Sequence, residues 1–577
     1  MKYLNEKMLM YRQEYPKPQF ERENWLNLNG EWDFEIDYGE SGEQQKWYEN
    51  HKFSQKIIVP FCPESKLSGI ENTDFMKSIW YKRTVFLNDE QIKEETYLHF
   101  GAVDYFATIY VNGIECGTHK GGYVSFKVNI TKAVKVGENS IVVHAQDDTR
   151  SPIIPSGKQS GNYYSKGCYY TRTTGIWQTV WLEFVPKTHL EKVKYYPDIY
   201  NQCLHVLAEV NGDAFLHAKA TFERKEMGEV RVKCKSGEIA LTIPLKEKHL
   251  WEVGKGGLYD IEFCYGEDKV KSYFGLRSVR MDGYQFFLND KSVFQRLVLD
   301  QGFYPDGIYT APTDKDLEKD IDISMSMGFN GARLHEKIFE ERFLYYCDKK
   351  GYMVWGEYPN WGLQYSHDGA LGAFLPEWLE TVERDFNHPC IIGWCPFNEV
   401  WTDEKWDKVK HLLQVAYAMT KFVDGTRPCI DTSGGIHRTS DVYDVHDYTQ
   451  EPDVLKSHFE KIEQGEQNNP YGEAPYAWLY EYPVGKPIMV SEYGGIGWNS
   501  QTGWCYGTTP KTEEEFYTRL ESLTNVLLNN ECIFGFCYTQ LVDVEQEQNG
   551  LYTYDRTPKF DNKRLYKIFS KKAKIEG

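Results

Sequence analysis

Two carboxylates stand where hydrophobic runs of the sequence end. The stretch CIIGWCPF closes on Asn398 and Glu399, and the stretch KPIMV closes on Ser491 and Glu492. Charged side chains are rarely buried without a compensating role. Two carboxyl groups about 5–5.5 Å apart can split a glycosidic bond with retention, because one protonates the leaving oxygen while the other attacks the anomeric carbon. The pair therefore predicts glycosidic-bond chemistry, provided that the fold brings the two runs together.

A barrel of parallel strands would bring them together. After about residue 277, strand-like apolar runs alternate with amphipathic helical patterns, and we count eight such runs. We predict a TIM (β/α)8 barrel over residues 277–577. Runs four and seven carry Glu399 and Glu492, and side chains at the C-terminal strand ends share one mouth. The eight predicted strands are SVFQRLVL, FNGARL, YMVWGEY, CIIGWCPFNE, RPCIDTS, VYDVHDY, KPIMVSEYGG and CIFGFCYTQL.

Helical patterns separate several of these runs. Thr313 is placed to cap a helix in which Leu317, Ile321 and Met325 share one face, and which ends at Gly328. The stretches FEERFLYYCDKKG and KWDKVKHLLQVAYAMTKFVD have the same amphipathic period.

The first half of the chain has a different pattern. Short alternating segments such as TYLHFGAVDYFATIYVNG and IWQTVWLEFV are separated by turn residues, which predicts a jelly-roll β-sandwich over residues 1–186. Shorter alternating stretches follow, including CLHVLAEV and LYDIEFCYG. They predict an immunoglobulin-like β-sandwich over residues 187–276.

Composition excludes several classes of partner. A net charge of −19 argues against binding to nucleic acid or to an anionic membrane surface, because like charges repel. No run approaches the ~18 apolar residues of a membrane span, and the N-terminal segment lacks the apolar core of a signal peptide, so we expect a cytoplasmic protein. Thirteen scattered cysteines predict neither a disulfide framework nor a zinc site.

Many motifs resemble those of glycoside hydrolase family 2, which contains β-galactosidases, β-glucuronidases and β-mannosidases. The segments RDFNHPCIIGWCPFNE and VSEYGG are similar to its acid/base and nucleophile motifs, and the resemblance covers nearly the full chain in the family's order. The first part is similar to the family's sugar-binding sandwich, through RENWLNLNGEWDF, VPFCPESKLSGI, WYKRTV, GAVDYFATIYVNG and TRTTGIWQTVWLE.

The resemblance implies roles for four residues. Glu399 would be the general acid/base and Glu492 the nucleophile of a retaining double displacement. Asn398 would hydrogen-bond the sugar 2-OH, and Arg333 matches the arginine that the family places near its nucleophile.

The two carboxyl groups need different pKa values. We expect Trp394, Phe397 and the charge of Glu492 to keep a proton on Glu399, because apolar and anionic surroundings raise a carboxyl pKa. A nearby Arg333 would instead keep Glu492 ionised.

Further side chains at the predicted strand ends are candidates for substrate binding. Each also has a purely structural interpretation, as a hydrogen-bonded core histidine, a rim charge or a packed ring. The three tryptophans could form a stacking platform for a sugar. The candidates are His335, His446, Tyr448, Glu357, Asn360, Trp361, Trp498 and Trp504.

The identity of the sugar depends on one departure from the family pattern. β-Glucuronidases of the family carry an Asn-x-Lys element whose lysine binds the C6 carboxylate, whereas this chain has Asn549 followed by Leu551 at the lysine position. Lys337, Arg342 or a residue of the loop PSGKQSGNYYSKGC (155–168) could supply that charge. We expect a galacto-configured glycone, a β-galactoside or β-galacturonide, ahead of a β-glucuronide, with a β-mannoside further behind.

No cofactor is expected from the motifs. A phosphate-binding or Gly-rich cofactor loop is missing, so we predict no organic cofactor. Some relatives hold Mg²⁺ near the acid/base, but no ligand set for Mg²⁺ can be recognised, and the metal question stays open. The predicted partner is a carbohydrate, a β-glycoside or glycoconjugate. A homo-oligomer is left open, as is a carbohydrate-binding protein without catalysis.

Overall fold

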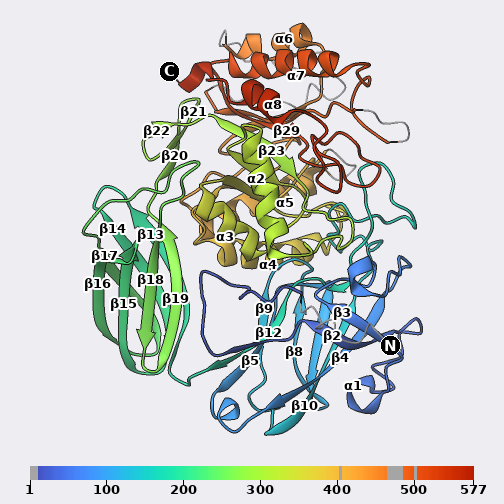
Figure 1. The fold of residues 1–577 in the computed structure, drawn as a ribbon, viewed down its shortest axis with the longest axis vertical. Coiled ribbons are helices and arrows are strands. Elements are labelled where there is room, and N and C mark those ends of the chain that lie inside the picture. The colour runs from blue at the N-terminus through green and yellow to red at the C-terminus, as the bar shows by residue number, and fades with distance from the viewer. Residues whose placement is uncertain (1–10, 402–405, 464–484, 499–502, 577) are drawn as a thin grey trace, which may run out of the picture.

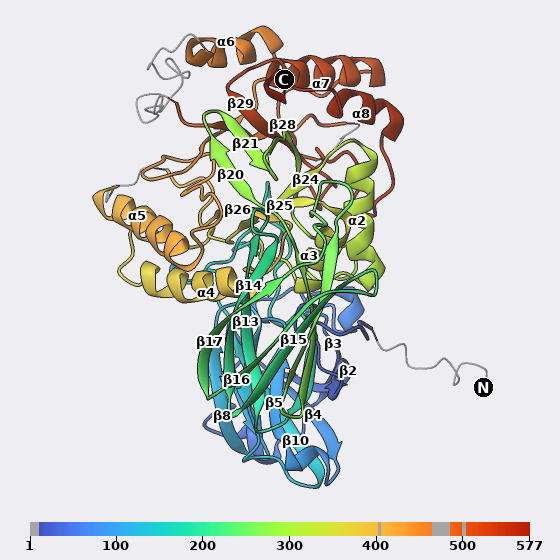
Figure 2. The same cartoon turned by 90° about the vertical axis from the view of Figure 1, so that its left-hand side faces the viewer.

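The computed structural model describes residues 11–401, 406–463, 485–498 and 503–576. Two all-β parts, blue and green in Figure 1, support a part in which helices surround parallel strands. In Figure 2 the green β part lies in front of the blue one, and both are below the helical part. The multidomain β and α/β architecture predicted from the sequence is confirmed.

The first β part is a sandwich of two antiparallel sheets. A six-stranded sheet has the order β3-β2-β4-β10-β7-β8, and a four-stranded sheet has the order β1-β12-β5-β9. Alternate residues of β2 point into the core between them, including Trp32 and Phe34, which are almost fully buried. The strands are β1 Trp25–Asn27, β2 Gly30–Ile36, β3 Gln55–Val59, β4 Ser78–Leu87, β5 Glu95–Phe100, β6 Val103–Asp104, β7 Phe106–Val111, β8 Ile114–Lys120, β9 Phe126–Asn129, β10 Gly137–Gln146, β11 Gly175–Ile176 and β12 Val180–Val185, with the short helix α1 Trp47–Asn50.

The second β part has its own core. A three-stranded sheet, β13-β14-β17, faces a four-stranded sheet, β16-β15-β18-β19, and seven strands are the number of an immunoglobulin-like sandwich. Leu216, Ala218 and Ala220 alternate inward along β15. The strands are β13 His189–Asp198, β14 Cys203–Asn211, β15 Ala214–Phe222, β16 Lys225–Cys234, β17 Gly237–Pro244, β18 Leu258–Tyr265 and β19 Asp268–Gly275. A small sheet of β20 Val279–Asp282, β21 Gln285–Leu288 and β22 Lys291–Ser292 leads into the barrel.

Seven parallel strands form the sheet of the barrel, in the order β26-β25-β24-β23-β29-β28-β27. All seven are buried along their whole length or at all but one residue, as expected for parallel strands covered on both faces. The strands are β23 Gln295–Asp300, β24 Gly331–Leu334, β25 Met353–Glu357, β26 Ile391–Cys395, β27 Tyr443–Asp447, β28 Ile488–Gly494 and β29 Ile533–Thr539.

The fifth predicted strand, RPCIDTS, is not a regular strand. It follows β26 through only two parallel bridges, Trp394 with Cys429 and Asn398 with Ser433. The backbone N–H of Ile430 donates to Trp394 O at 2.9 Å, and that of Ser433 donates to Phe397 O at 2.8 Å. Pro428 cannot donate to a ladder, so the segment takes the fifth position of the ring without forming continuous pairs.

The helices cover the outside of these strands, as Figure 1 shows for α2 to α5. The predicted cap at Thr313 begins α2 as part of a capping box, in which the Thr313 backbone N–H donates to the Asp316 carboxylate at 3.0 Å. Gly351 ends α3 in the left-handed region, with φ 67°. The helices are α2 Asp314–Ser326, α3 Glu341–Lys350, α4 Ala370–Asp385, α5 Trp406–Val423, α6 Pro452–Glu463, α7 Glu513–Leu528 and α8 Asn562–Phe569. Among the residues described, none of these helices is long and apolar enough to cross a membrane.

Candidate active site

Glu399 and Glu492 meet at the mouth of the barrel. One carboxylate oxygen of each, together with a ring nitrogen of His446, all lie within 4.8 Å of one another. Glu492 is part of β28, whereas Glu399 follows β26 by four residues and has a left-handed backbone with φ 49°. The backbone N–H of Glu399 donates to Ser433 O at 2.8 Å, so the bridged fifth segment fixes this unusual conformation. Glu399 therefore belongs to the barrel mouth and not to a following helix.

Arg333, the third residue of β24, is the hub of the site. Its guanidinium is 1% exposed and donates from Nη1 to Glu492 at 2.7 Å, from Nε to Glu357 at 2.6 Å and from Nη2 to Asn398 Oδ1 at 2.6 Å. These acceptors come from three different strand ends, so a single planar fork sets their relative positions.

Glu492 is held as an anion. Burial alone would raise its pKa, but the charges of His446 and Arg333 and a hydrogen bond from the Tyr448 hydroxyl lower the pKa of Glu492 to about 2. Arg333 and Tyr448 each donate to a different oxygen of the carboxylate. Arg333 thus lowers the pKa of Glu492 together with His446 and Tyr448.

His446, near the end of β27, lies between the two carboxylates. Its Nδ1 is 2.8 Å from Glu399 Oε1, and its Nε2 is 3.4 Å from Glu492 Oε1. Burial alone would lower the pKa of His446, but the two carboxylates raise it. The hydrogen-bonding neighbour of Glu399 is therefore a basic imidazole.

Trp394 and Phe397, which we expected to surround Glu399 with apolar groups, contact other residues. Trp394 donates its ring N–H to Asp424 at 2.7 Å, and Phe397 packs against Phe374 with ring centroids 4.5 Å apart. Both rings are fully buried in the barrel core. They fix the end of β26, while His446 supplies the polar contact to Glu399.

Asn398 is positioned through its backbone and one side-chain atom. Asn360 Oδ1 accepts from the Asn398 N–H at 2.7 Å, and Asn360 Nδ2 donates to Asn398 O at 2.9 Å. While Asn398 Oδ1 accepts from Arg333, its buried Nδ2 has no hydrogen-bond partner within the described ranges. A donor is therefore available for a ligand.

His335 and Glu357 form a supporting layer. Glu357 accepts from Arg333, from the Glu336 backbone at 2.9 Å and from His335 Nδ1 at 2.9 Å. Burial, with Lys158 and Arg333 nearby, lowers the pKa of His335 well below its usual range, so this imidazole is neutral. Both residues orient Arg333, and Glu357 is almost completely buried.

The three tryptophans do not share one environment. Trp361 lies 6.5 Å from the His335 ring, beside the barrel mouth. Trp504 is 36% exposed and packs edge-on to Tyr506, which itself stacks on Tyr448 at 3.4 Å. Trp498 packs between Phe516 and Phe560, at the edge of the hydrophobic core.

The cations expected near a C6 carboxylate lie elsewhere. Lys337 is buried, and its ammonium donates to Gly302 O at 2.5 Å and Tyr309 O at 2.8 Å. Arg342 pairs with Asp314 at 2.7 Å. Asn549 is also engaged, because its amide donates to Glu547 at 3.1 Å and its carbonyl accepts from Gln540 at 2.8 Å.

One residue of the site was not singled out from the sequence. Lys158, from the loop between β10 and β11, places its ammonium 3.9 Å from the centre of the Trp361 ring. In Figure 1 the teal segment after β10 rises from the blue sandwich beside the barrel. The loop 155–168 had been marked as a source of positive charge, but no periodic pattern identifies which of its lysines reaches the barrel.

The group formed by Glu399, His446 and Glu492 does not suit Mg²⁺. Both oxygens of Glu492 accept hydrogen bonds, and both ring nitrogens of His446 are engaged. Mg²⁺ needs nearly octahedral oxygen ligands, and the guanidinium of Arg333 would repel it.

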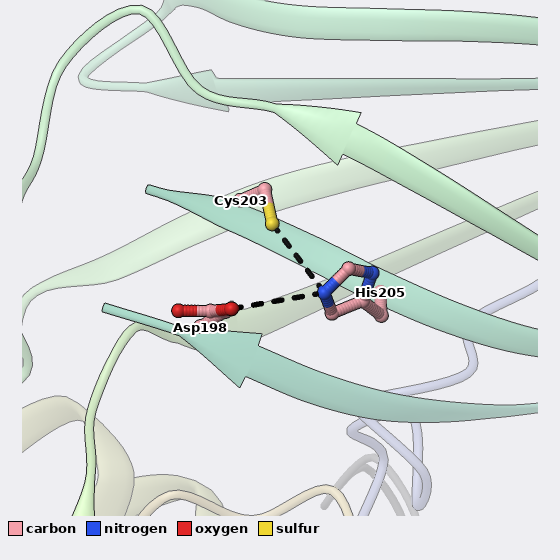
Figure 3. A group of neighbouring side chains, drawn as sticks. All are labelled: Asp198, Cys203 and His205. Atoms are coloured by element: carbon pink, nitrogen blue, oxygen red, sulfur yellow. Dashed lines mark hydrogen bonds and ion pairs between the residues drawn. The ribbon is translucent and has the colours of Figure 1, made fainter. Parts of the chain in front are cut away.

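A second set of metal-ligand types lies in the second sandwich (Figure 3). His205 Nε2 is 3.5 Å from Cys203 Sγ and 3.9 Å from Asp198 Oδ2. The Asp198 carboxylate already accepts from the backbone of Tyr200 and Asn201, each at 2.9 Å, and so closes the turn between β13 and β14.

The comparisons with known proteins agree with this architecture. The family model described as "Glycosyl hydrolases family 2, sugar binding domain" matches residues 26–186, and "Glycosyl hydrolases family 2, TIM barrel domain" matches residues 285–572. The crystal structure of Ruminococcus gnavus β-glucuronidase superposes with a TM-score of 0.78 at 19% identity, over 98% of this chain and 100% of that one.

Curated relatives carry two activity names. A putative β-glucuronidase of Formosa agariphila is 27% identical over 56% of this chain and 40% of its own length. A β-galactosidase of Thermoanaerobacter pseudethanolicus is 27% identical over 73% of this chain and 54% of its own length. The chain thus spans about half the length of these relatives. From the two family models, matched in order along both parts, and the mouth at which Glu399 and Glu492 converge, the chain belongs to glycoside hydrolase family 2.

Proposed function

We propose that this protein is a retaining exo-β-glycosidase that acts by double displacement, with Glu492 as nucleophile and Glu399 as general acid/base. The observation that carries the proposal is the approach of one oxygen from each carboxyl group to within 4.8 Å. Retaining glycosidases need carboxyl groups close enough for direct attack, whereas inverting enzymes leave room for a water molecule between them.

In the first step, a Glu492 oxygen forms a bond to the anomeric carbon as the glycosidic C–O bond breaks. Glu399 gives its proton to the leaving oxygen. In the second step, Glu399 removes a proton from water, the water oxygen bonds to the anomeric carbon, and Glu492 leaves as a carboxylate. The low pKa of Glu492 keeps it ionised for attack and makes it a good leaving group.

His446 would hold the proton needed by Glu399. The imidazole Nδ1 lies 2.8 Å from Glu399, and the two carboxylates raise the pKa of His446, so the imidazole can exchange a proton with Glu399. Glu399 can deliver that proton to the leaving group and take one from water in the second step. The free Nδ2 of Asn398 supports its role as donor to the sugar 2-OH.

Contacts from the first sandwich support exo action. The backbone N–H groups of Ser156 and Gly157 donate to Trp361 O at 2.7 and 3.1 Å, so the loop after β10 packs against the loop after β25. This loop of the first sandwich therefore lies beside the barrel mouth and would restrict the site to a terminal sugar.

The glycone is the finer part of the proposal. Leu551, at the position of the family's carboxylate-binding lysine, is 1% exposed in the core, and this supports a substrate other than an ordinary β-glucuronide. We propose a galacto-configured glycone, a β-galactoside or β-galacturonide. The relatives named β-glucuronidase make a β-glucuronide the second candidate, with its carboxylate bound at a different position.

The mechanism can be tested with Glu399→Gln and Glu492→Gln on p-nitrophenyl β-galactoside, galacturonide, glucuronide, glucoside and mannoside. We expect both variants to lose at least about 10³-fold in kcat, and NMR of the wild-type reaction to detect the β-anomer first. The exposed Glu513→Gln is the control. Wild-type turnover in either variant, or an α-anomer as first product, would overturn the assignment. Sugar binding without turnover of any glycoside would favour a non-catalytic binding protein.

A further inference from the structure

Lys158 is a buried cation without an anionic partner. It is 6% exposed, and within the described ranges its ammonium makes no ion pair or hydrogen bond, only the contact with the Trp361 ring at 3.9 Å. Lysine is seldom buried unless it is paired, because the ammonium loses its hydration. The Trp361 ring supplies a cation–π attraction but no hydrogen-bond acceptor. Three N–H donors of the ammonium therefore remain without an acceptor among the described residues.

The position of Lys158 is fixed from both sides. Its carbonyl accepts from the Tyr170 N–H at 2.7 Å, and the preceding residues Ser156 and Gly157 donate to Trp361 O. Gly157 has φ 54°, and a Cβ atom there would lie 2.5 Å from Glu336 O. The next residue, Gln159, donates to Asp104 at 2.7 Å. Such anchoring keeps the ammonium in one place without a side-chain partner.

The ammonium faces the catalytic carboxylates. Burial alone would lower the pKa of Lys158, but interactions with Cys168 and with the carboxylates of Glu547, Glu399 and Glu492 raise it. Lys158 in turn lowers the pKa of His335, which belongs to the layer under Arg333. The Trp361 ring under the Lys158 ammonium lies 6.5 Å from the His335 ring, so Lys158 stands beside the layer that supports Arg333, although none of these carboxylates lies at ion-pairing distance.

The other cations near this space are engaged. Arg333 is saturated by Glu357, Glu492 and Asn398. Lys337 is held by backbone carbonyls and Arg342 by Asp314. Lys158 is therefore the available positive charge among these four. Burial, the largest cause, raises the pKa of neighbouring Glu336 well above its usual range, so this carboxyl binds a proton more readily and repels an incoming anion less.

We propose that Lys158 binds the C6 carboxylate of the glycone, and that the substrate is consequently a β-uronide. The inference rests on the proposed exo-glycosidase function and narrows it to the charged member of the galacto-configured pair, with β-glucuronide as the epimer to be compared. A C6 carboxylate would complete a charge-assisted hydrogen bond in a buried site. A neutral C6 hydroxyl would leave the ammonium without its counter-charge.

The test compares kcat/KM for p-nitrophenyl β-D-galacturonide and β-D-glucuronide with the matched β-D-galactoside and β-D-glucoside. We expect wild-type protein to prefer at least one uronide over its neutral counterpart by about 100-fold or more. Lys158→Met keeps the length of the side chain without its charge. It should lose roughly 100-fold on that uronide, as for removal of one partner of a buried charge pair, and at least tenfold less on the neutral sugar.

Two further variants guard against misfolding. Lys158→Arg retains a cation and should recover part of the uronide preference. Lys166→Met, an exposed lysine of the same loop, should match wild type on all four substrates. A wild-type preference for the neutral sugar, or equal losses of Lys158→Met on uronide and neutral sugar, would overturn the role of Lys158 and leave the exo-glycosidase proposal intact.

If no glycoside is hydrolysed, binding measurements distinguish the carboxylate site at Lys158 from the proposed catalytic function. Calorimetry with free D-galacturonate, D-glucuronate, D-galactose and D-glucose needs no turnover. If no glycoside is hydrolysed but a uronate binds at least tenfold more weakly to Lys158→Met than to wild type, the carboxylate site stands and the catalytic proposal falls. If uronate and neutral sugar bind equally to wild type, the carboxylate site falls.

Discussion

Replacing Arg333 with methionine should move the acid limb of the pH–rate profile. The pKa of Glu492 falls from 4.5 to about 2, a difference of about 2.5 units, through His446, Arg333, His335 and Tyr448 acting against burial. At about 1.36 kcal/mol per unit, the charged form is favoured by roughly 3 kcal/mol. An adjacent arginine typically accounts for about 1–3 units.

The expected result follows from the part of the Glu492 pKa lowering that Arg333 causes. In Arg333→Met, the pKa of Glu492 should rise by at least about one unit, because burial remains while one cation is lost. Activity below the pKa of the nucleophile is lost, so the acid limb of kcat/KM should shift to higher pH by the same amount. The value of kcat/KM at pH 7 should also fall by about 10²-fold or more, because Asn398 and Glu357 lose their common donor.

The assay should isolate the nucleophile. A dinitrophenyl glycoside needs little protonation of its leaving group, so its acid limb reports Glu492 and not Glu399. Arg333→Lys keeps a charge but not the planar fork, and should shift the limb less than the methionine variant. Circular dichroism must establish that each variant is folded. An unchanged acid limb in a folded Arg333→Met protein would refute the electrostatic reasoning.

Two other predictions concern the contacts between the parts of the chain. Gly157→Ala should lower kcat/KM at least about tenfold, because the added Cβ would press on Glu336 O and displace Lys158. Gly167→Ala is the control. Gly167 also has a positive φ, 61°, but a Cβ there would lie in open space, so this variant should have a much smaller effect. Equal effects would mean that backbone strain, not the contact, is responsible. Arg22→Met should lower the free energy of unfolding by about 3–5 kcal/mol, because Arg22 is buried and bridges Glu183 of the first sandwich at 3.1 Å to Asp268 of the second at 2.9 Å. Burial alone would raise the pKa of Glu183, but His99 and Arg22 lower it well below 4.5, so this contribution is complete above about pH 4.5 and is lost as the pH falls further. Urea titrations at pH 7 and pH 4 measure both effects, and an unchanged midpoint at pH 7 would contradict the bridge.

The contact between the first sandwich and the barrel has a functional meaning in this scheme. The loop after β10 belongs to the sandwich through Gln159 and Asp104, yet its neighbouring residues bond to the backbone of Trp361. A sandwich that positions Lys158 contributes directly to the glycone site. Loops on a rigid scaffold are common carriers of specificity, because they can change without disturbing the core.

His446 illustrates a limit of motif-based expectation. The sequence places an imidazole at the end of the sixth run, and its proximity to both carboxylates depends on how β27 pairs with β28, where the register shifts between Val445 and His446. That irregularity places His446 opposite Glu492. Spacing along the chain does not contain this information, since a shift of one residue reverses the face that a side chain occupies.

The sequence by itself determined the order and type of the elements. Hydrophobic residues repeat every two positions in strands and about every 3.6 positions in helices, so the sequence reveals the local backbone state. The two sandwiches, the capped start of α2 and the apolar runs of the barrel strands could therefore be predicted from the residues. The predictions for Glu399, Glu492, Asn398 and Arg333 also came from the sequence, because each residue lies at the end of a run and matches a family motif without long-range information.

Only the tertiary structure decided which side chains meet. Lys337 and Lys158 are both buried lysines, yet one is bound by the carbonyls of Gly302 and Tyr309 while the other contacts the Trp361 ring at the barrel mouth. Likewise, Trp361 lies at the mouth and Trp498 in a core contact. The physical reason is that burial, hydrogen-bond partners and pKa values are set by atoms hundreds of residues away in the chain, and these are brought together only when the sandwiches and the barrel pack against each other.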